Sequence, residues 1–405
     1  MEWIETQRQR MCRLVTEWSS LNTGSYNRAG LDRCADAIAG EFSPLGGDIE
    51  FVDLPPQVCI DSSGSTFQRR LGRAIRIRKR RGSGLPVFLG IHYDTVFGPD
   101  DGFQNTELLD ENTLRGPGVA DAKGGLVVMR VALEALERSG LAEGIGWEVF
   151  INPDEEIGSP GSAPLLAEMA RDNALGLLYE PALEDGALAG ARKGSGNYTV
   201  AVRGREAHAG RDFHTGRNAI HALAELIVGL NQLNGGAEGV TVNVGRIEGG
   251  GPVNVVPALA IGRFNARVTT PEQQRWLTAR IDELIGQIAR QDGIRVELHG
   301  GFASPPKLVD EPMRQLLESV ASCGRELGIP IHWRSTGGAC DGNKLAAAGL
   351  VNVDSLGVRG GHLHSNREFL ILDSLTERAR LSALLLMKLA SGEIDWPPKK
   401  VEAIP

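Results

Sequence analysis

Apolar runs of strand length alternate with helical stretches through the first half of the chain. Residues 85–91 and residues 147–151 are two such runs, each nearly continuous in apolar side chains. Between them, residues 125–138 carry apolar side chains at helical spacing, namely Leu126, Met129, Leu133 and Leu136. Strands that alternate with helices are typical of an α/β fold, so this half predicts a domain with a central, mostly parallel sheet.

The pattern changes from about residue 194. Four shorter strand patterns follow, at residues 198–202, 240–244, 260–268 and 294–298. A helix is predicted from Asn218, and a second begins with Thr270 as its N-cap, Pro271 at its first position and Gln273 completing a capping box. The order β-α-β-β-α-β predicts an inserted α+β domain over residues 194–303. Residues 1–193 and 304–405 would then form one discontinuous domain.

Composition narrows the classes of function. A chain of 405 residues exceeds the usual size of one domain, and its formal charge of −8 disfavours binding to nucleic acid or to anionic membranes. No apolar run approaches the length that spans a bilayer, and the N-terminus lacks the features of a secretory signal. The five cysteines are scattered without a C-x-x-C pair, which predicts reduced thiols and a cytoplasmic protein.

One local exception to the acidic composition is the arginine-rich stretch at residues 69–81. Arginines alternate there with apolar residues over positions 74–78, a period of two that is typical of a strand with one solvated face. The alternative is an arm that binds anions. We favour the solvated strand because of the alternation.

Polar residues with metal-binding chemistry directly follow three of the apolar runs. His92 and Asp94 follow the first, the pair Glu155 and Glu156 follows the second, and Glu180 follows residues 177–179. Ligands collect at the carboxyl ends of strands in such sheets, so these side chains are expected to meet. A neighbouring glutamate pair is more commonly a solvated turn. In metal-assisted hydrolysis, however, one acid serves as ligand and the other moves the proton.

Two further residues complete the candidate set: Asp121 in the glycine-rich turn at residues 115–125, and His364 near the C-terminus. Taken singly, each residue has a simpler explanation, such as a packed histidine or an ordinary loop. A nucleotide cradle is excluded for the turn, because neither phosphate-binding glycine motif is present. The ordered set predicts a two-metal, zinc-dependent amide hydrolase.

These residues also carry a resemblance to a known family. The matching segments are LNTG at 21–24, HYDTV at 92–96, GPGVADAKGG at 116–125, DEEIGS at 154–159, EPA at 180–182, GREAHAG at 204–210 and HSNRE at 364–368. The chain resembles the zinc-dependent aminoacylase, desuccinylase and glutamate carboxypeptidase superfamily, and most of all its glutamate carboxypeptidase branch. The resemblance implies a zinc-exopeptidase-like catalytic domain with an inserted lid and dimerisation domain.

The resemblance also implies a metal site. Asp121 would bridge two divalent ions, with zinc expected first and cobalt or manganese as alternatives. His92 and Glu180 would complete one ion's ligands, and Glu156 and His364 those of the other. His362 stands two residues before His364 and is left out of the site, although a strand would place both histidines on one face.

Further roles follow from the same resemblance. Glu155 would be the general base and Asp94 would orient His92. His208 would reach the substrate carbonyl as an oxyanion donor, usually from the partner subunit of a homodimer formed through the lid. Asn254 and Arg267 would hold the substrate.

The resemblance is weaker in the segments that would bind the substrate. Residues 298–304 lack the arginine that glutamate carboxypeptidases carry after the last lid strand, and Lys307 is a possible stand-in. The sequence at residues 337–343 resembles that of the deacylases more than that of the glutamate carboxypeptidases. We therefore expect hydrolysis of an amide bond next to a free carboxylate, in an N-acyl amino acid or short peptide. An N-acyl-amino-acid deacylase and a dipeptidase are the alternatives, and a catalytically inactive ligand-binding family member is the alternative from another class.

Overall fold

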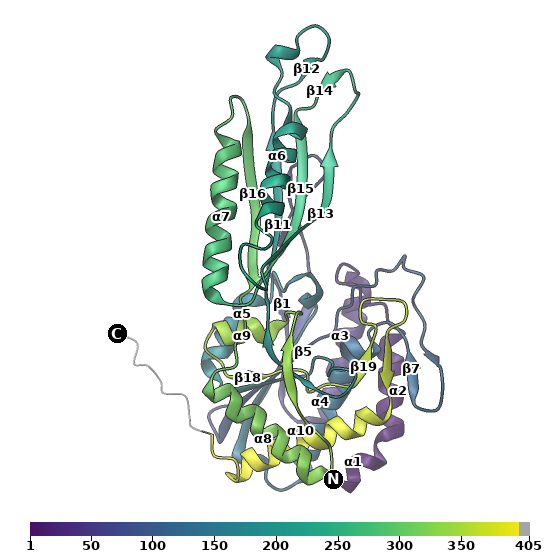
Figure 1. Ribbon diagram of the computed structural model, residues 1–405. Helices are drawn as coiled ribbons and strands as arrows, with labels where there is room; N and C mark the ends of the chain where they lie inside the picture. Colours follow the sequence, from purple (N-terminus) through teal and green to yellow (C-terminus); the bar gives the residue numbers. More distant parts are fainter. Residues whose placement is uncertain (397–405) are drawn as a thin grey trace.

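The computed structural model describes residues 1–396 and shows an α/β body that carries a long, narrow extension (Figure 1). The central sheet of the body has six strands, in the order β1 (Asp48–Asp53), β4 (Arg73–Lys79), β8 (Ile145–Asn152), β5 (Leu85–His92), β9 (Leu175–Leu178) and β18 (Asn352–Val353). Strands β8, β5, β9 and β18 are parallel, whereas β1 and β4 are antiparallel to their neighbours. The predicted α/β fold with a mostly parallel sheet is confirmed.

Helices cover both faces of this sheet. One face packs against α2 (Arg8–Ser19), α3 (Arg28–Phe42), α4 (Gly125–Arg138), α8 (Glu311–Leu327) and α10 (Asp373–Ser391). The other face packs against α5 (Ala163–Asp172) and α9 (Asp341–Ala347). Val87 and Leu89 of β5 are buried on the first side and Phe88 on the second. Burial on both faces is why this strand appears in the sequence as a nearly continuous apolar run.

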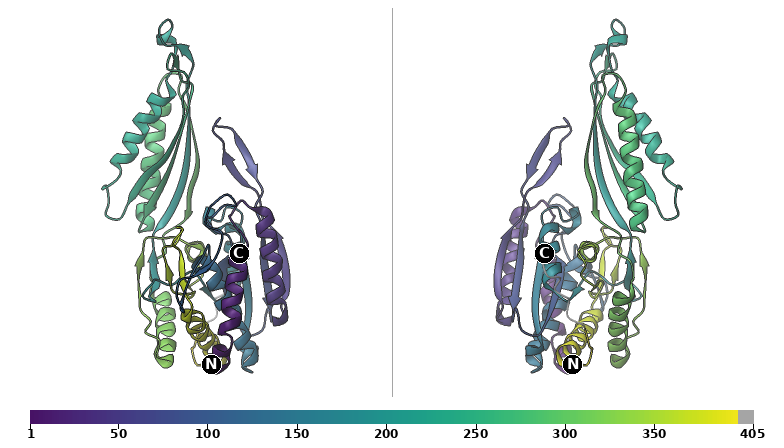
Figure 2. Two further views of the ribbon diagram at one scale, coloured as in Figure 1. Left: turned by 90° about the vertical axis from the view of Figure 1, so that its right-hand side faces the viewer. Right: turned by 90° about the vertical axis from the view of Figure 1, so that its left-hand side faces the viewer.

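The extension contains a second sheet, antiparallel throughout, in the order β13 (Thr241–Gly249), β15 (Leu259–Val268), β11 (Gly194–Arg203) and β16 (Arg295–Ser304). Helices α6 (Ala219–Gln232) and α7 (Pro271–Ala289) cover one face, where Tyr198, Val200 and Val202 are buried. The opposite face looks towards a hairpin of the body, β2 (Gln57–Ile60) and β3 (Thr66–Arg69) (Figure 2).

The remaining elements are short. They include α1 (Glu2–Thr6), β6 (Glu107–Leu108), β7 (Thr113–Arg115), β10 (Leu188–Arg192), β12 (Ala207–His208), β14 (Val255–Val256), β17 (Trp333–Thr336), β19 (Gly360–Gly361) and β20 (Phe369–Ile371). All five cysteines are free. Within residues 1–396, we find no helix that combines the length and the apolar character required to cross a membrane.

Local details differ from the sequence-based expectations at two places. Gln273 does not cap Thr270 reciprocally: its side-chain oxygen accepts from the backbone N–H of Thr269 instead. His362 and His364 both have positive φ, of 54° and 59°, so they lie in a loop rather than along a strand. They therefore do not share one strand face, and the ring of His362 packs against Phe369.

Candidate metal centre

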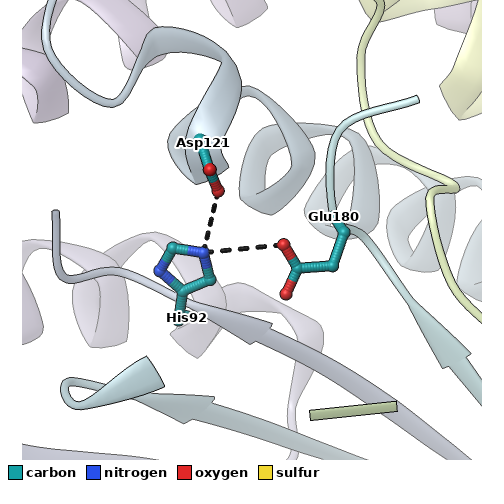
Figure 3. Close-up of side chains that lie close together, drawn as sticks. All are labelled: His92, Asp121 and Glu180. Atoms are coloured by element: carbon teal, nitrogen blue, oxygen red, sulfur yellow. Dashed lines mark hydrogen bonds and ion pairs between the residues drawn. The ribbon is translucent and has the colours of Figure 1, made fainter. Parts of the chain in front are cut away.

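The centre forms where three neighbouring parallel strands end. His92 is the last residue of β5, the turn with Glu155 and Glu156 follows β8, and Glu180 follows β9. Because β8, β5 and β9 are hydrogen-bonded neighbours in this order, their carboxyl ends lie side by side. Figure 3 shows Asp121, which approaches the ring of His92 from the helix side, together with Glu180. Parallel strands thus bring together side chains that are far apart in the sequence.

Asp121 is held by the glycine-rich turn that precedes α4. Gly118 has φ of +70°, and a Cβ there would lie 2.7 Å from the Thr95 side chain, so the turn requires glycine. The buried carboxylate of Glu368 accepts hydrogen bonds of 3.0–3.1 Å from the backbone N–H groups of Gly118, Ala120 and Asp121. Glu368 therefore fixes this turn. In the sequence, Glu368 ends the HSNRE motif at residues 364–368, where no role was predicted for it.

Two groups of potential ligands share Asp121. In the first, Nε2 of His92 lies 3.0 Å from Oδ1 of Asp121 and 3.7 Å from Oε2 of Glu180. In the second, Nε2 of His364 lies 3.3 Å from Oδ2 of Asp121 and 3.1 Å from Oε2 of Glu156. Within each group, one ligand atom per residue lies within 4.8 Å of the others. Asp121 thus directs one oxygen to each group, the arrangement that a bridging carboxylate requires.

The charge of the cluster fits divalent cations. Burial and the neighbouring Asp121 carboxylate raise the pKa of Glu156 to about 7. Burial, followed by the charge of Glu180, raises the pKa of Glu155 well above its ordinary value. Hydrogen bonds to Asp121 and Glu156 raise the pKa of His364 to about 11. Carboxylates crowded in a buried place favour positive charge beside them, and a metal ion would supply it in place of protons.

Asp94 connects His92 with the glutamate turn. Nδ1 of His92 lies 3.0 Å from the backbone oxygen of Asp94 and 3.3 Å from its carboxylate. The same carboxylate accepts hydrogen bonds of 3.2 Å from the backbone N–H groups of Glu155 and Glu156. Asp94 therefore contacts both the imidazole of His92 and the backbone of the two acids.

The cleft over these residues has a volume of about 390 Å³. Glu155 lines it together with Asp121, Glu156, Glu180 and His364, yet belongs to neither ligand group. Lys344 lies close enough to Glu155 for its charge to lower that carboxyl's pKa, and it is held by Asp341 at 2.9 Å. The geometry leaves Glu155 available to exchange a proton inside the cleft.

His208 and Asn254 lie together but away from this cleft. Strands β12 and β14 pair at the far end of the extension, and the backbone N–H of Ala209 donates to the backbone oxygen of Asn254 at 2.9 Å (Figure 1). Nδ1 of the exposed His208 accepts from the backbone N–H groups of Gly210 and Arg211, which leaves Nε2 as the donor. Arg267 lies elsewhere, at the end of β15 nearer the body, where its Nε donates to Asn265.

Arg192 is a further residue of the cleft that the sequence analysis missed. It ends β10 and lines the cleft, with Nε and Nη2 at 2.9 and 2.6 Å from the Asp354 carboxylate. Lys307, the residue suggested as a stand-in for the absent arginine, is fully buried and binds the other oxygen of Asp354 at 2.7 Å. Lys307 is not among the residues that line the cleft. No motif in the sequence singles out Arg192.

Comparison with known proteins places this geometry in a family. Residues 88–388 match peptidase family M20/M25/M40. The chain is 27% identical over 329 residues to carboxypeptidase G2 of Pseudomonas sp. (strain RS-16), covering 78% of this chain and 77% of that protein. It is also 27% identical over 320 residues to succinyl-diaminopimelate desuccinylase of Gluconobacter oxydans, covering 75% of this chain and 81% of that protein.

A solved structure shares the fold over nearly the whole length. A tripeptidase from Staphylococcus aureus superposes with a TM-score of 0.73 at 20% identity, covering 95% of this chain and 99% of that one. The predicted resemblance to the zinc-dependent superfamily is therefore confirmed. The family match extends over most of the chain, so this protein belongs to peptidase family M20/M25/M40 and is a metal-dependent hydrolase of amide or peptide bonds.

Proposed function

We propose that the chain is a carboxypeptidase of the glutamate carboxypeptidase type, which cleaves the amide bond next to a free carboxylate. The observation that carries this proposal is a largely buried cation, Arg192, whose side chain is 10% exposed and lines the same cleft as Glu155 and the carboxylates of the two ligand groups. The substrate would be an N-acyl amino acid or a short peptide. Similarity to carboxypeptidase G2 supports this substrate class.

Arg192 has the charge that a substrate carboxylate would need. Arg192 and Lys307 share one buried carboxylate, Asp354, so the cluster holds two positive charges against one negative charge. Among residues 1–396, Nη1 of Arg192 makes only a long hydrogen bond of 3.4 Å, to the backbone oxygen of Gly338. Buried charges are stable when they are paired, and an incoming carboxylate would complete the pairing.

The residues present fit two divalent ions, with zinc expected first and cobalt or manganese as alternatives. His92, Asp121 and Glu180 would hold one ion, and Asp121, Glu156 and His364 the other. When bound, such a pair supplies Lewis acidity for the scissile carbonyl and lowers the pKa of a water. Glu155 would take the proton of the attacking water and deliver it to the leaving nitrogen.

Residues 194–303 would form a lid and dimerisation domain, and residues 1–193 and 304–405 the catalytic domain, of which 397–405 lie outside the described residues. In a homodimer, Nε2 of His208 would donate to the developing oxyanion in the partner's cleft. Asn254 and Arg267 would help to hold the substrate. The position of β12 and β14 at the far end of the extension supports action on a partner rather than on the same chain.

An N-acyl-amino-acid deacylase is the second candidate, favoured by the similarity to a desuccinylase and by the sequence at residues 337–343. A dipeptidase remains a third. The inactive ligand-binding alternative is disfavoured, because all five expected ligands fall into the two ligand groups and Glu155 lines the cleft beside them.

A substrate panel tests the proposal. The zinc-loaded protein would be assayed with N-acyl amino acids, with the same compounds as C-terminal carboxamides, and with free dipeptides. We expect kcat/KM for the free acids to exceed that for the carboxamides by about 100-fold, since a charge-assisted pair contributes about 3 kcal/mol. Equal cleavage of acids and carboxamides would remove the carboxylate requirement, and a preference for free dipeptides would identify a dipeptidase.

A further inference from the structure

A second cavity lies between the β2–β3 hairpin and the open face of the second sheet. We name it the hairpin groove, and its volume is about 670 Å³. Figure 2 shows the hairpin rising beside the face of the sheet that carries no helix. Tyr26, Phe67 and Arg69 line the groove from the body, and Asn197, Arg263 and Asn265 line it from the sheet. No residue assigned to the metal centre belongs to this lining.

The hairpin is held against the sheet by hydrogen bonds to its backbone. Nη2 of Arg263 donates to the backbone oxygen of Ile60 at 3.0 Å, and Nη2 of Arg203 donates to that of Gly64 at 2.7 Å. These bonds connect parts of the chain that are separated by 203 and 139 residues in sequence. The groove is therefore built by specific long-range contacts.

The open face of the sheet presents polar side chains in rows across its strands. Asn243, Asn265 and Asn197 are register partners on three adjacent strands. Nδ2 of Asn265 donates to Oδ1 of Asn197 at 2.7 Å, and Nε of Arg267 donates to Oδ1 of Asn265 at 2.8 Å. Arg267 is thus hydrogen-bonded to Asn265, the middle amide of this row. The Asn265 amide is already hydrogen-bonded to its neighbours, whereas the Asn243 side chain has no hydrogen-bond partner among residues 1–396. The Asn243 amide therefore offers donors and an acceptor to a ligand that has amide groups of its own.

The groove carries a surplus of positive charge. Three arginines line it, Arg69, Arg246 and Arg263, and no aspartate or glutamate does so among residues 1–396. Glu248, outside the lining, pairs with both Arg246 and Arg263, so two cations share one carboxylate. The guanidinium of Arg69 lies 4.2 Å from the ring centroid of Tyr26, and no carboxylate partner for it occurs in the described part of the chain. An anionic ligand matches this field.

A smaller pocket adjoins both the groove and the metal cleft. Among residues 1–396, Glu156 is the residue that lines both this pocket and the metal cleft. Tyr26 borders both the pocket and the hairpin groove. A substrate that has its carboxylate at Arg192 and its scissile bond over the ligand groups would extend towards the groove with its acyl side.

We propose that the hairpin groove binds the acyl side of the substrate, and that this acyl group is an extended, acidic, peptide-like chain. The arginines would pair with its carboxylates and the asparagine row with its amides. The assignment rests on the proposed cleavage next to a free carboxylate, whose carboxylate would occupy the separate Arg192 end of the cleft.

Binding of a peptide that cannot serve as a carboxypeptidase substrate tests the groove directly. The probe is acetyl-Glu-Asp-Glu carboxamide, titrated calorimetrically into the full-length, zinc-loaded protein. We expect saturable binding that Arg69→Gln weakens by about tenfold, the loss of one charge-assisted hydrogen bond. The matched control is Arg70→Gln, at an exposed neighbour outside the groove lining, which should bind like wild type. Absent binding, or equal weakening in both variants, would overturn the proposal.

Kinetics separate failure of the groove from failure of the proposed function. Acetyl-X and acetyl-Glu-Asp-X, with the same C-terminal amino acid X, would be compared in wild type and both variants. Arg69→Gln should raise KM for the longer substrate about tenfold and leave kcat/KM for the shorter one within about twofold. Equal effects on both substrates would contradict the groove. Cleavage of neither substrate by wild type would contradict the proposed function, while the titration would still decide the groove.

Discussion

At the scale of single residues, the carboxylates of the metal centre differ in the direction in which each side chain points. Asp121 directs one carboxylate oxygen towards each imidazole, His92 on one side and His364 on the other. Glu155 and Glu156 are neighbours in sequence, yet only Glu156 belongs to a ligand group. Asp94 holds the backbone N–H groups of both. Because Glu155 lines the cleft outside the ligand groups, we expect it to be the acid that moves the proton.

Replacing Glu155 tests whether it moves the proton while Glu156 binds metal. Glu155→Gln should keep the fold and both metal equivalents while kcat falls by on the order of 10²-fold or more, because an amide cannot take up the proton. Metal content by elemental analysis and kcat on the best substrate of the panel are the two measurements. Glu168→Gln, on a partly exposed helix position of α5, is the control and should turn over normally. A metal-replete Glu155→Gln protein with near-normal kcat would refute the general-base role.

At the scale of secondary-structure elements, the pattern of apolar residues predicted the strands and helices whose own side chains are buried in a regular order. Strands β5 and β8 and helix α4 lie almost where the apolar runs and the helical spacing placed them. Residues that follow strands could be predicted to meet because parallel strands end at one edge. Arg192 and Glu368 could not be given roles in this way. Their partners lie 162 and 247 residues away, at Asp354 and at the Asp121 turn, and only the tertiary fold brings them together.

One contact at the end of α4 joins that helix to the sheet and makes stability depend on pH. Although burial raises the pKa of Glu137, hydrogen bonds from Arg80, Lys79 and Trp147 lower it to about 2. A glutamate in an unfolded chain has a pKa of about 4.3. Because the folded pKa is the lower one, this contact stabilises the fold fully above about pH 4.3 and is lost as pH falls towards 2.

Glu137→Gln should therefore lower the free energy of unfolding by about 1–3 kcal/mol at pH 7. The difference from wild type should shrink at pH 3, where the wild-type contact is already weakened. Chemical denaturation of the metal-free proteins at both pH values measures it, with the exposed Glu143→Gln as control. A difference between wild type and Glu137→Gln that stays constant from pH 7 to pH 3 would show that the carboxylate does not act through its charge.

At the scale of the whole molecule, the extension carries His208 far from the metal centre of its own chain (Figure 1). Strand β13 is an edge of the second sheet in the described residues, so its backbone is available for pairing with another chain. A two-fold dimer would bring one protomer's His208 to its partner's cleft. This arrangement is a prediction that mixed subunits can test.

Co-expression of His208→Ala subunits with Glu155→Gln subunits provides the test. In each heterodimer one active site would receive both lesions and the other neither, so activity should return to at most about half of wild type. Tandem affinity purification would isolate the heterodimer before assay. A verified heterodimer with no more activity than its two parents would show that His208 does not serve the partner's site, and a monomer in solution would exclude the exchange altogether.

We propose that five side chains hold two metal ions which share Asp121. Anomalous diffraction at the zinc edge, from crystals of the zinc-loaded protein, would locate these ions. We expect two anomalous peaks about 3.5–4 Å apart. One should lie among His92, Asp121 and Glu180, the other among Asp121, Glu156 and His364, and neither should appear in crystals of Asp121→Ala. A single peak, peaks elsewhere, or two peaks that survive in Asp121→Ala would contradict the proposal.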